Sequence, residues 1–183
     1  MNKKETILKA ALELLVENGI HATPMSAIAK KANTGMGTIY NYFENKEALI
    51  NAIYVAIKEE EKQVLDTVFN KDLPVKIQFE MYYSIVVDFF TKSRLYFGFM
   101  DQLQASPIIT AESKNVGYNA IEGAISLLLK GKKEHIIKNI ENDELLQFIG
   151  GSILSYLRWI NLPNNNNKSL KNQINLVWDA IKE

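Results

Sequence analysis

The sequence contains no cysteine, so disulfide bonds and thiolate metal sites are excluded. It has no apolar run long enough to span a bilayer, and its N-terminus lacks the pattern of a signal peptide. The net charge is zero, and 47% of the 183 residues are hydrophobic, which is normal for one large domain or two small ones. We therefore expect a soluble, cytoplasmic protein with no membrane contact.

Patterns typical of catalysis and of metal binding are also missing. His21 and His135 are the only histidines, and neither has a nucleophile, a base or metal-ligand spacing near it. We therefore predict no catalytic residues, no metal site and no cofactor. An enzyme is the least favoured class of function.

Apolar residues recur at helical spacing along the whole chain, and neither an internal repeat nor an alternating strand pattern occurs. We predict an all-α fold, in which the charged segment Glu59–Lys62 is solvated. The basic turn GKKEH at 131–135 precedes weaker helical sequence, and LPNNNNKS at 162–169 reads as a polar linker. Beyond the first 45 residues, the helices are predicted over 46–69, 74–92, 93–104, 110–130, 143–160 and 169–182.

The first helix has its own start and stop signals. Asn2 and Glu5 have the spacing of a capping box, and Asn18-Gly19 ends the helical run. We interpret the apolar stripe between these signals as core that the following helices cover, so that residues 1–45 form a compact three-helix head. The stripe consists of Leu8, Ala11, Leu12 and Leu15.

The segment 23–46, TPMSAIAKKANTGMGTIYNYFENK, reads as two short helices, a tight turn between them, and the capped start of a third. The Thr23 hydroxyl is expected to cap the first of these helices, with proline at its first position. Asn33 can take the left-handed conformation that the turn needs, and Gly35 adds freedom there. In the second helix, 36–43, Ile39 and Phe43 point inward. This is the layout of a helix-turn-helix, whose second helix enters the DNA major groove.

Two segments resemble TetR-family transcriptional regulators: GTIYNYFENKEAL at 37–49 and ILKAALELLVENGIHAT at 7–23. Together they cover about the first quarter of the chain. Asn33 stands where many members have glycine, and Gly35 where many have a serine or similar cap. The resemblance implies a helix-turn-helix head, joined by a long helix to a C-terminal helical domain for ligand binding and dimerisation. We assign residues 1–46 to DNA binding and 47–183 to the effector and the dimer.

Side chains at the start of the second helix are the candidates for DNA contact, and Lys46 with its helix N-terminus can bind phosphate. That helix lacks Arg and Lys, so the commonest guanine contact is unavailable. Tyr40 and Tyr42 could instead pack the head, and Lys30 and Lys31 could be a plain solvated face. The candidates are Thr23, Ser26, Gly35, Met36, Gly37, Thr38, Tyr40, Asn41, Tyr42 and Lys46.

Charge supports this assignment only weakly. Residues 1–46 carry six lysines and four glutamates, and the rest of the chain has fifteen basic and seventeen acidic residues. The slightly basic head suits a DNA-facing surface, but charge by itself would not identify a nucleic-acid-binding protein.

Aromatic residues crowd the middle of the chain, and the resemblance implies that this region binds a small, largely apolar effector. Asp88 interrupts an apolar run, where a charge is costly unless it is paired. It is either a polar handle for the ligand, or it pairs with a cation or points to solvent. Each aromatic residue could equally be plain core. The candidate ligand residues are Tyr82, Asp88, Phe89, Phe99 and Tyr118.

The last two helices are apolar on more than one side, which calls for a second partner. The resemblance implies that they pair with their copies in a homodimer, although core packing explains the stripe on the final helix about equally well. The candidate interface residues are Gly150, Ile153, Leu154, Leu157 and Trp178.

Taken together, these patterns and the resemblance imply a ligand-responsive, DNA-binding transcriptional regulator. The expected form is a homodimeric repressor that a small effector releases from a pseudo-palindromic, double-stranded operator. The alternative is a TetR-like adaptor or co-regulator that acts through protein–protein contacts. DNA binding in a gel shift separates the two.

Overall fold

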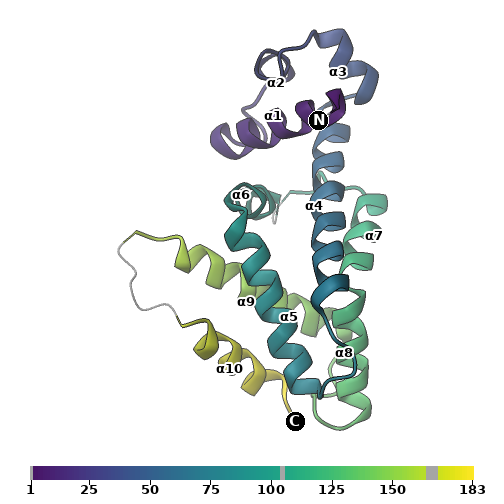
Figure 1. The fold of residues 1–183 in the computed structure, drawn as a ribbon, viewed down its shortest axis with the longest axis vertical. Helices are drawn as coiled ribbons and strands as arrows, with labels where there is room; N and C mark the ends of the chain where they lie inside the picture. Colours follow the sequence, from purple (N-terminus) through teal and green to yellow (C-terminus); the bar gives the residue numbers. More distant parts are fainter. Residues whose placement is uncertain (1, 104–105, 164–168) are drawn as a thin grey trace. The chain divides into compact units, whose positions relative to one another are not determined.

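The computed structural model describes residues 2–103, 106–163 and 169–183, which form ten helices (Figure 1). The fold is all-α, as predicted, and the one β pairing within these ranges is an isolated antiparallel bridge between Ile137 and Lys182. The chain divides into two compact units. Unit 1 comprises Met1–Glu60 with Ser93–Gly117, and unit 2 comprises Glu61–Lys92 with Tyr118–Glu183.

The helix-turn-helix region lies in unit 1. Its helices are α1 (Lys3–Asn18), α2 (Met25–Lys31) and α3 (Met36–Tyr42). The predicted capping box is confirmed, because the Asn2 side chain accepts from the Glu5 amide at 2.9 Å and Glu5 accepts from the Asn2 amide. Gly19 ends α1 with φ 93°, a conformation that favours glycine. The apolar stripe of α1 is core, although Leu8 is only half-buried.

Helix α6 (Arg94–Leu103) packs against α1, a contact that the sequence did not predict. Gly98 permits this approach, since a Cβ there would lie 2.9 Å from a methyl group of Val16. The Gln102 side chain accepts from the Ile20 amide at 3.1 Å and donates to the Val16 carbonyl at 3.2 Å. The cover of α1 therefore comes partly from residues far along the chain.

The long helix α4 (Lys46–Val68) begins and ends close to its predicted limits. Asn45 caps it by accepting from the Ala48 amide at 2.8 Å. In unit 1, the side chain of buried Asn51 forms hydrogen bonds with two backbone groups of the segment that leads into α7 (Ala111–Ala120). It donates to the Ile108 carbonyl and accepts from the Thr110 amide, both at 2.9 Å.

Unit 2 is built around α5 (Val75–Lys92), which contacts α8 (Glu122–Lys133), α9 (Asn142–Ile160) and α10 (Leu170–Ile181) (Figure 1). The Phe79 ring lies 5.4 Å from that of Trp178 and 5.9 Å from that of Tyr83. The Tyr83 hydroxyl bonds to Ser152 at 3.0 Å. Aromatic rings therefore form the centre of this unit.

Three predictions about these helices need correction. The helix expected over 110–130 is interrupted at Ile121, next to Gly123, where a Cβ would lie 3.4 Å from the Phe69 ring. Helix α8 continues through the first three residues of the basic segment and ends at Lys133, and the chain then turns at Glu134 and His135, the latter with φ 55°, into a non-helical segment. Glu61 is only 2% exposed and so is not solvated.

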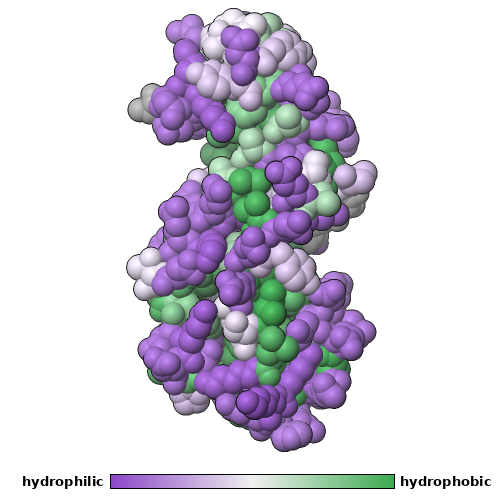
Figure 2. Space-filling view, turned by 90° about the vertical axis from the view of Figure 1, so that its right-hand side faces the viewer, coloured by the Kyte–Doolittle hydropathy of each residue, from purple (hydrophilic) through white to green (hydrophobic). Residues whose placement is uncertain are grey.

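Of the predicted linker at 162–169, residues 164–168 lie outside the described residues. None of the helices in the described ranges is long and apolar enough to cross a membrane. On the face drawn in Figure 2, hydrophilic side chains predominate and hydrophobic ones form narrow strips.

Candidate nucleic-acid interface and cavity

The turn between α2 and α3 has the conformation that the sequence predicts. Asn33 has φ 47°, and the Thr34 amide donates to the Ala29 carbonyl at 3.0 Å. Gly35 precedes α3 with φ −79°, an ordinary extended value, so its extra freedom is not used. No side chain caps α3, which leaves amide groups at its start available to another acceptor.

Helix α3 is anchored on one side and open on the other. Ile39 and the following Phe43 are buried, whereas Tyr40 is 49% exposed and Asn41 and Tyr42 are also exposed. Neither tyrosine ring is therefore part of the core of the head. At Gly37 a Cβ would meet nothing within 4 Å, and Met36 and Thr38 are half-buried.

Lys46 is the first residue of α4 and connects it to the loop after α1. Its Nζ donates to the His21 carbonyl at 3.2 Å, and partial burial lowers the pKa of its ammonium group. The side chain thus places a cation beside the capped N-terminus of α4. The charge of the ammonium group and the positive end of the helix dipole both favour binding of an anion there.

Thr23 does not have the expected role. Pro24 precedes α2 without a side-chain cap, and the buried Thr23 hydroxyl bonds to the Leu14 and Gly19 carbonyls at 3.1 and 2.9 Å. Thr23 therefore fixes the loop between α1 and α2 and does not form part of the exposed surface. Ser26 and Lys30 are exposed.

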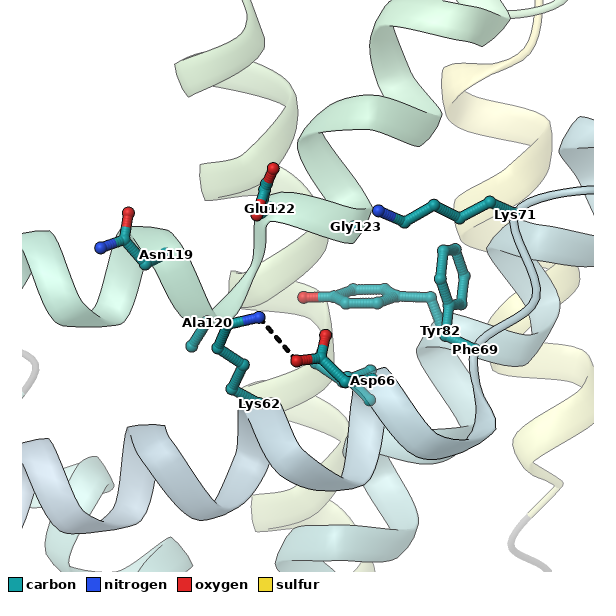
Figure 3. A pocket seen from close by; sticks show the side chains of 10 residues that line it. Lys62, Asp66, Phe69, Lys71, Tyr82, Asn119, Ala120, Glu122 and Gly123 are labelled. Carbon is teal, nitrogen blue, oxygen red and sulfur yellow. Dashed lines mark hydrogen bonds and ion pairs between the residues drawn. The ribbon is translucent and has the colours of Figure 1, made fainter.

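A cavity of about 250 Å³ lies in unit 2, between the end of α4, the loop after it, α5 and the start of α8 (Figure 3). The Phe69 and Tyr82 rings meet edge to face at 6.4 Å and form its apolar wall. The Lys62 ammonium and the Asp66 carboxylate pair across its rim at 2.7 Å. The lining residues are Lys62, Leu65, Asp66, Phe69, Lys71, Tyr82, Asn119, Ala120, Glu122 and Gly123.

The Tyr82 hydroxyl is the most distinctive group of this cavity. The residue is only 7% exposed, and the hydroxyl has no hydrogen-bond partner among the described residues. In Figure 3 it points into the space that the charged side chains surround. Burial and the nearby Glu61 carboxylate both raise the pKa of this phenol, so it stays neutral.

A wider groove of about 480 Å³ lies in unit 1, between α4 and α7. Its buried polar residues, Asn51 and Ser113, already have hydrogen-bond partners within the chain. The groove therefore offers a ligand no buried polar group in need of a partner, and the cavity of unit 2 is the stronger candidate site.

Comparison with known proteins identifies the family. Residues 7–53 match the profile described as "Bacterial regulatory proteins, tetR family". The HTH-type transcriptional regulator YhgD of Bacillus subtilis, itself uncharacterised, is 40% identical over 74 residues, which are 40% of this chain and 39% of YhgD. Along the full length of both chains, a TetR-family structure from Shewanella sp. PV-4 superimposes with a TM-score of 0.87 at 21% identity. Residues 7–53 of this chain belong to the TetR family.

The family profile matches only residues 7–53. The chain spans well under half the length of the curated relatives that it matches, and beyond the head the structures support the fold alone. One such structure, FadR from Bacillus subtilis in complex with stearoyl-CoA, has a TM-score of 0.74 at 21% identity over 96% of this chain and 95% of FadR. The matches are transcription regulators and not enzymes, as expected. In the described residues, no group of His, Asp or Glu could hold a metal ion.

The five predicted ligand residues of this chain do not come together. Tyr82 lines the cavity, but Phe89 packs against Phe90 with ring centroids 5.1 Å apart, and Phe99 is wholly buried in unit 1. Tyr118 is exposed and bonds to Asp143.

Asp88 is not a ligand handle. It is exposed to solvent, and its carboxylate pairs with the Lys92 ammonium one helical turn later, at 2.6 Å. The structure therefore agrees with the alternative reading, in which this carboxylate pairs with a cation and points to solvent.

Most of the predicted interface residues belong to the chain's own core. Ile153, Leu157 and Trp178 are buried within unit 2, because α9 and α10 turn their most apolar faces to α5. Gly150 and Leu154 are half-buried. The large apolar side chains exposed on and just after these helices are Phe148, Trp159, Leu162 and Leu176.

The cavity residues Phe69, Lys71 and Glu122 were missed from sequence. Phe69 and Lys71 lie in the loop after α4 and Glu122 is the first residue of α8, so two segments far apart in the sequence meet at the cavity. Two glycines near the break between α7 and α8, Gly117 and Gly123, lower helix propensity and were the one signal in the sequence.

Proposed function

We propose that this TetR-family protein is a cytoplasmic DNA-binding transcriptional regulator whose DNA affinity changes when a small molecule binds. The observation that carries the proposal is the open face of α3, a short helix anchored by Ile39 and presenting two exposed tyrosines. A helix anchored on one side and open on the other has the arrangement of a recognition helix in the major groove.

The proposed contacts divide by chemistry. Tyr40, Asn41 and Thr38 offer hydroxyl and amide groups to base edges or phosphates, and Gly37 leaves room for close backbone approach. Ser26 and Lys46 offer phosphate contacts at helix N-termini. Gly35, Met36 and Tyr42 complete the surface. Because α3 carries no Arg or Lys, we expect DNA shape and thymine methyl groups to contribute to specificity.

An operator can be selected from random duplexes, and its affinity measured by fluorescence anisotropy. Tyr40→Ala should weaken binding to the selected site by about tenfold or more, in line with 1–3 kcal/mol per base contact. The matched control is Tyr118→Ala, since Tyr118 is equally exposed, at 48%, but lies outside α3. Equal loss in both variants, or no selectable site, contradicts the proposal. An intact fold that binds no DNA would instead favour the adaptor alternative.

Lys46→Ala should act differently from Tyr40→Ala. Loss of one phosphate contact weakens binding to all sequences alike and lowers the slope of log K against log salt by about one. An unchanged slope would mean that Lys46 contacts the His21 carbonyl of the loop and no phosphate.

We further propose a homodimer through the exposed side of α9 and α10, where Leu176 is 68% exposed and Phe148 and Trp159 are exposed as well. A two-fold dimer would read a pseudo-palindrome with half-sites about 34–36 Å apart or a multiple of this spacing. Leu176→Glu should produce monomers in sedimentation. Leu129→Glu, an exposed leucine of α8, is the control and should stay dimeric. A wild-type chain that sediments as a monomer at micromolar concentration contradicts this model of the dimer.

We also propose that the regulator is a repressor, which its effector releases from the operator. The ligand-bound FadR structure supports a ligand response in this fold. Coupling requires the ligand to favour one of two arrangements of the protein. In a reporter strain, deletion of the gene should raise expression from the selected operator. Lowered expression would make the protein an activator.

A further inference from the structure

We propose that the cavity of unit 2 binds a small carboxylate with a flat apolar body, and that the Tyr82 hydroxyl and the Lys71 ammonium hold its carboxylate. This inference rests on the proposed ligand response, because it names the chemical class of the ligand. It follows from three observations: a hydroxyl donor open to the cavity, a cation without a carboxylate partner, and the size and walls of the cavity.

The first observation is the Tyr82 hydroxyl. No buried side-chain polar atom of the described residues lacks a hydrogen bond, so this hydroxyl, which has no protein partner, is open to the cavity and can bond to water or to a ligand there. The raised pKa keeps the proton on the phenol, which makes it a donor to an acceptor oxygen. Because the phenol lies edge-on to the Phe69 ring, a flat apolar group fits beside both rings.

The unpaired cation is Lys71. Among the charged groups that line the cavity, Lys62 is paired with Asp66, and the Glu122 carboxylate also acts on Lys62. Lys71 has no carboxylate partner among the described residues. In Figure 3 its side chain lies along the side of the cavity where Gly123 is found. An ammonium group without a carboxylate beside it is the natural partner for a ligand anion.

The loop that carries Lys71 is held from inside the fold. Buried Gln78 donates to the Lys71 carbonyl at 2.8 Å and to the Leu73 carbonyl at 2.6 Å, and Lys130 also donates to Leu73 at 3.3 Å. The backbone at Lys71 is thus fixed before a ligand arrives, which reduces the entropy lost on binding.

The volume limits the ligand. About 250 Å³ equals the liquid volume of about eight water molecules at about 30 Å³ each, so a ligand of about ten non-hydrogen atoms fits.

Phenylacetate and 2-phenylacetamide are suitable probes, because they share size and shape and differ in charge. We expect calorimetry with the full chain to show tighter binding of phenylacetate, by about tenfold, as for a hydrogen bond to a charged group. Equal affinity for the two probes overturns the assignment of an anionic ligand. No binding of either probe at millimolar concentration overturns the assignment of the class altogether.

Variants test the two donors separately. Tyr82→Phe should weaken both probes, since a carboxylate and an amide oxygen both accept from the phenol. Tyr156→Phe, at a buried tyrosine outside the cavity, should change neither. Lys71→Gln should remove the preference for phenylacetate and leave amide binding intact. Lys133→Gln, at an exposed lysine of α8 outside the cavity, is its control. Equal effects of a variant and its control contradict the assigned contact.

A final measurement separates this inference from the proposed function. DNA affinity of the same preparations, without a probe, tests the regulator alone. Normal operator binding without probe binding rejects the carboxylate class and leaves the regulator in place. Probe binding without operator binding rejects the regulator and leaves the cavity assignment standing.

Discussion

Unit 1 and unit 2 join distant segments by different interactions. In unit 1, polar side chains bond to backbone groups of other segments, as Gln102 does to the end of α1 and Asn51 to the segment before α7. In unit 2, aromatic rings meet at the centre, with Phe79 between Tyr83 and Trp178. Each aromatic side chain buries about 150–250 Å², whereas a hydrogen bond contributes about 1 kcal/mol net.

This difference suggests a division of stability between the units. Both units bury apolar side chains, but most of the buried aromatic rings lie in unit 2, whereas unit 1 buries mainly aliphatic side chains and adds hydrogen bonds between distant segments. Both tryptophans, Trp159 and Trp178, lie in unit 2, so fluorescence reports on that unit while circular dichroism reports on both. Denaturant titrations followed by both signals can therefore test the comparison directly.

The largest effect is expected from Phe79→Ala. The ring is 1% exposed, and its removal leaves a cavity between two other rings, which costs about 3–5 kcal/mol of unfolding free energy. The fluorescence midpoint in urea should fall sharply. Leu129→Ala on the surface of the same unit is the control and should change it little. If both variants lost similarly little unfolding free energy, the aromatic centre would not be what stabilises unit 2, and the distinction between the units would fail.

Asn51→Ala should cost less, about 2–3 kcal/mol, because it removes a buried side chain that makes two hydrogen bonds to the segment before α7, each contributing about 1–1.5 kcal/mol. The loss should appear in circular dichroism while the fluorescence midpoint stays near that of the wild type. Asn175→Ala, at an exposed position of α10, serves as control. A parallel fall of both signals would mean that the two units unfold together.

Gln102→Ala should cost about 1–2 kcal/mol, since the two backbone groups that it bonds lie only partly buried and water can reach them in part. Hydrogen exchange should speed up at the Ile20 amide in particular. Gln147→Ala on the exposed side of α9 is the control. Unchanged exchange at Ile20 would show that α6 does not hold the end of α1 in solution.

The smallest effect is expected from Asp88→Asn. An exposed pair one turn apart, as Asp88 forms with Lys92, contributes no more than about 0.5 kcal/mol. Stability and phenylacetate affinity should both stay within error of the wild type. A marked loss of probe affinity would restore Asp88 as a ligand residue.

Local signals were read correctly from the sequence. The capping box of α1, the left-handed Asn33 and the Asn45 cap of α4 each depend on residues within one turn of each other. The outward direction of Tyr40 followed from helical spacing. Which of these residues contact DNA stays a prediction.

Long-range geometry was out of reach. The cavity forms where α4, α5 and the start of α8 meet, and no spacing in the sequence indicates that Phe69 packs on Gly123. Periodicity also shows that α9 is apolar on two sides without telling which side faces its own core, so Ile153 and Leu157 were assigned to the wrong face. The ion pair of Asp88 could have been predicted from the sequence, because Lys92 lies four residues later, at the spacing at which side chains pair on a helix.

The contact between α6 and α1 affects how the protein is made. At about 5–20 residues per second, the ribosome takes on the order of ten seconds to extend the chain from the end of α1 to residue 103. Until then α1 has no cover from Gly98 and no bond from Gln102. The nascent head therefore leaves this side of α1 uncovered until α6 has been made. A fragment cut after residue 60 would keep it in that state permanently, with the helix-turn-helix complete but its first helix open to aggregation.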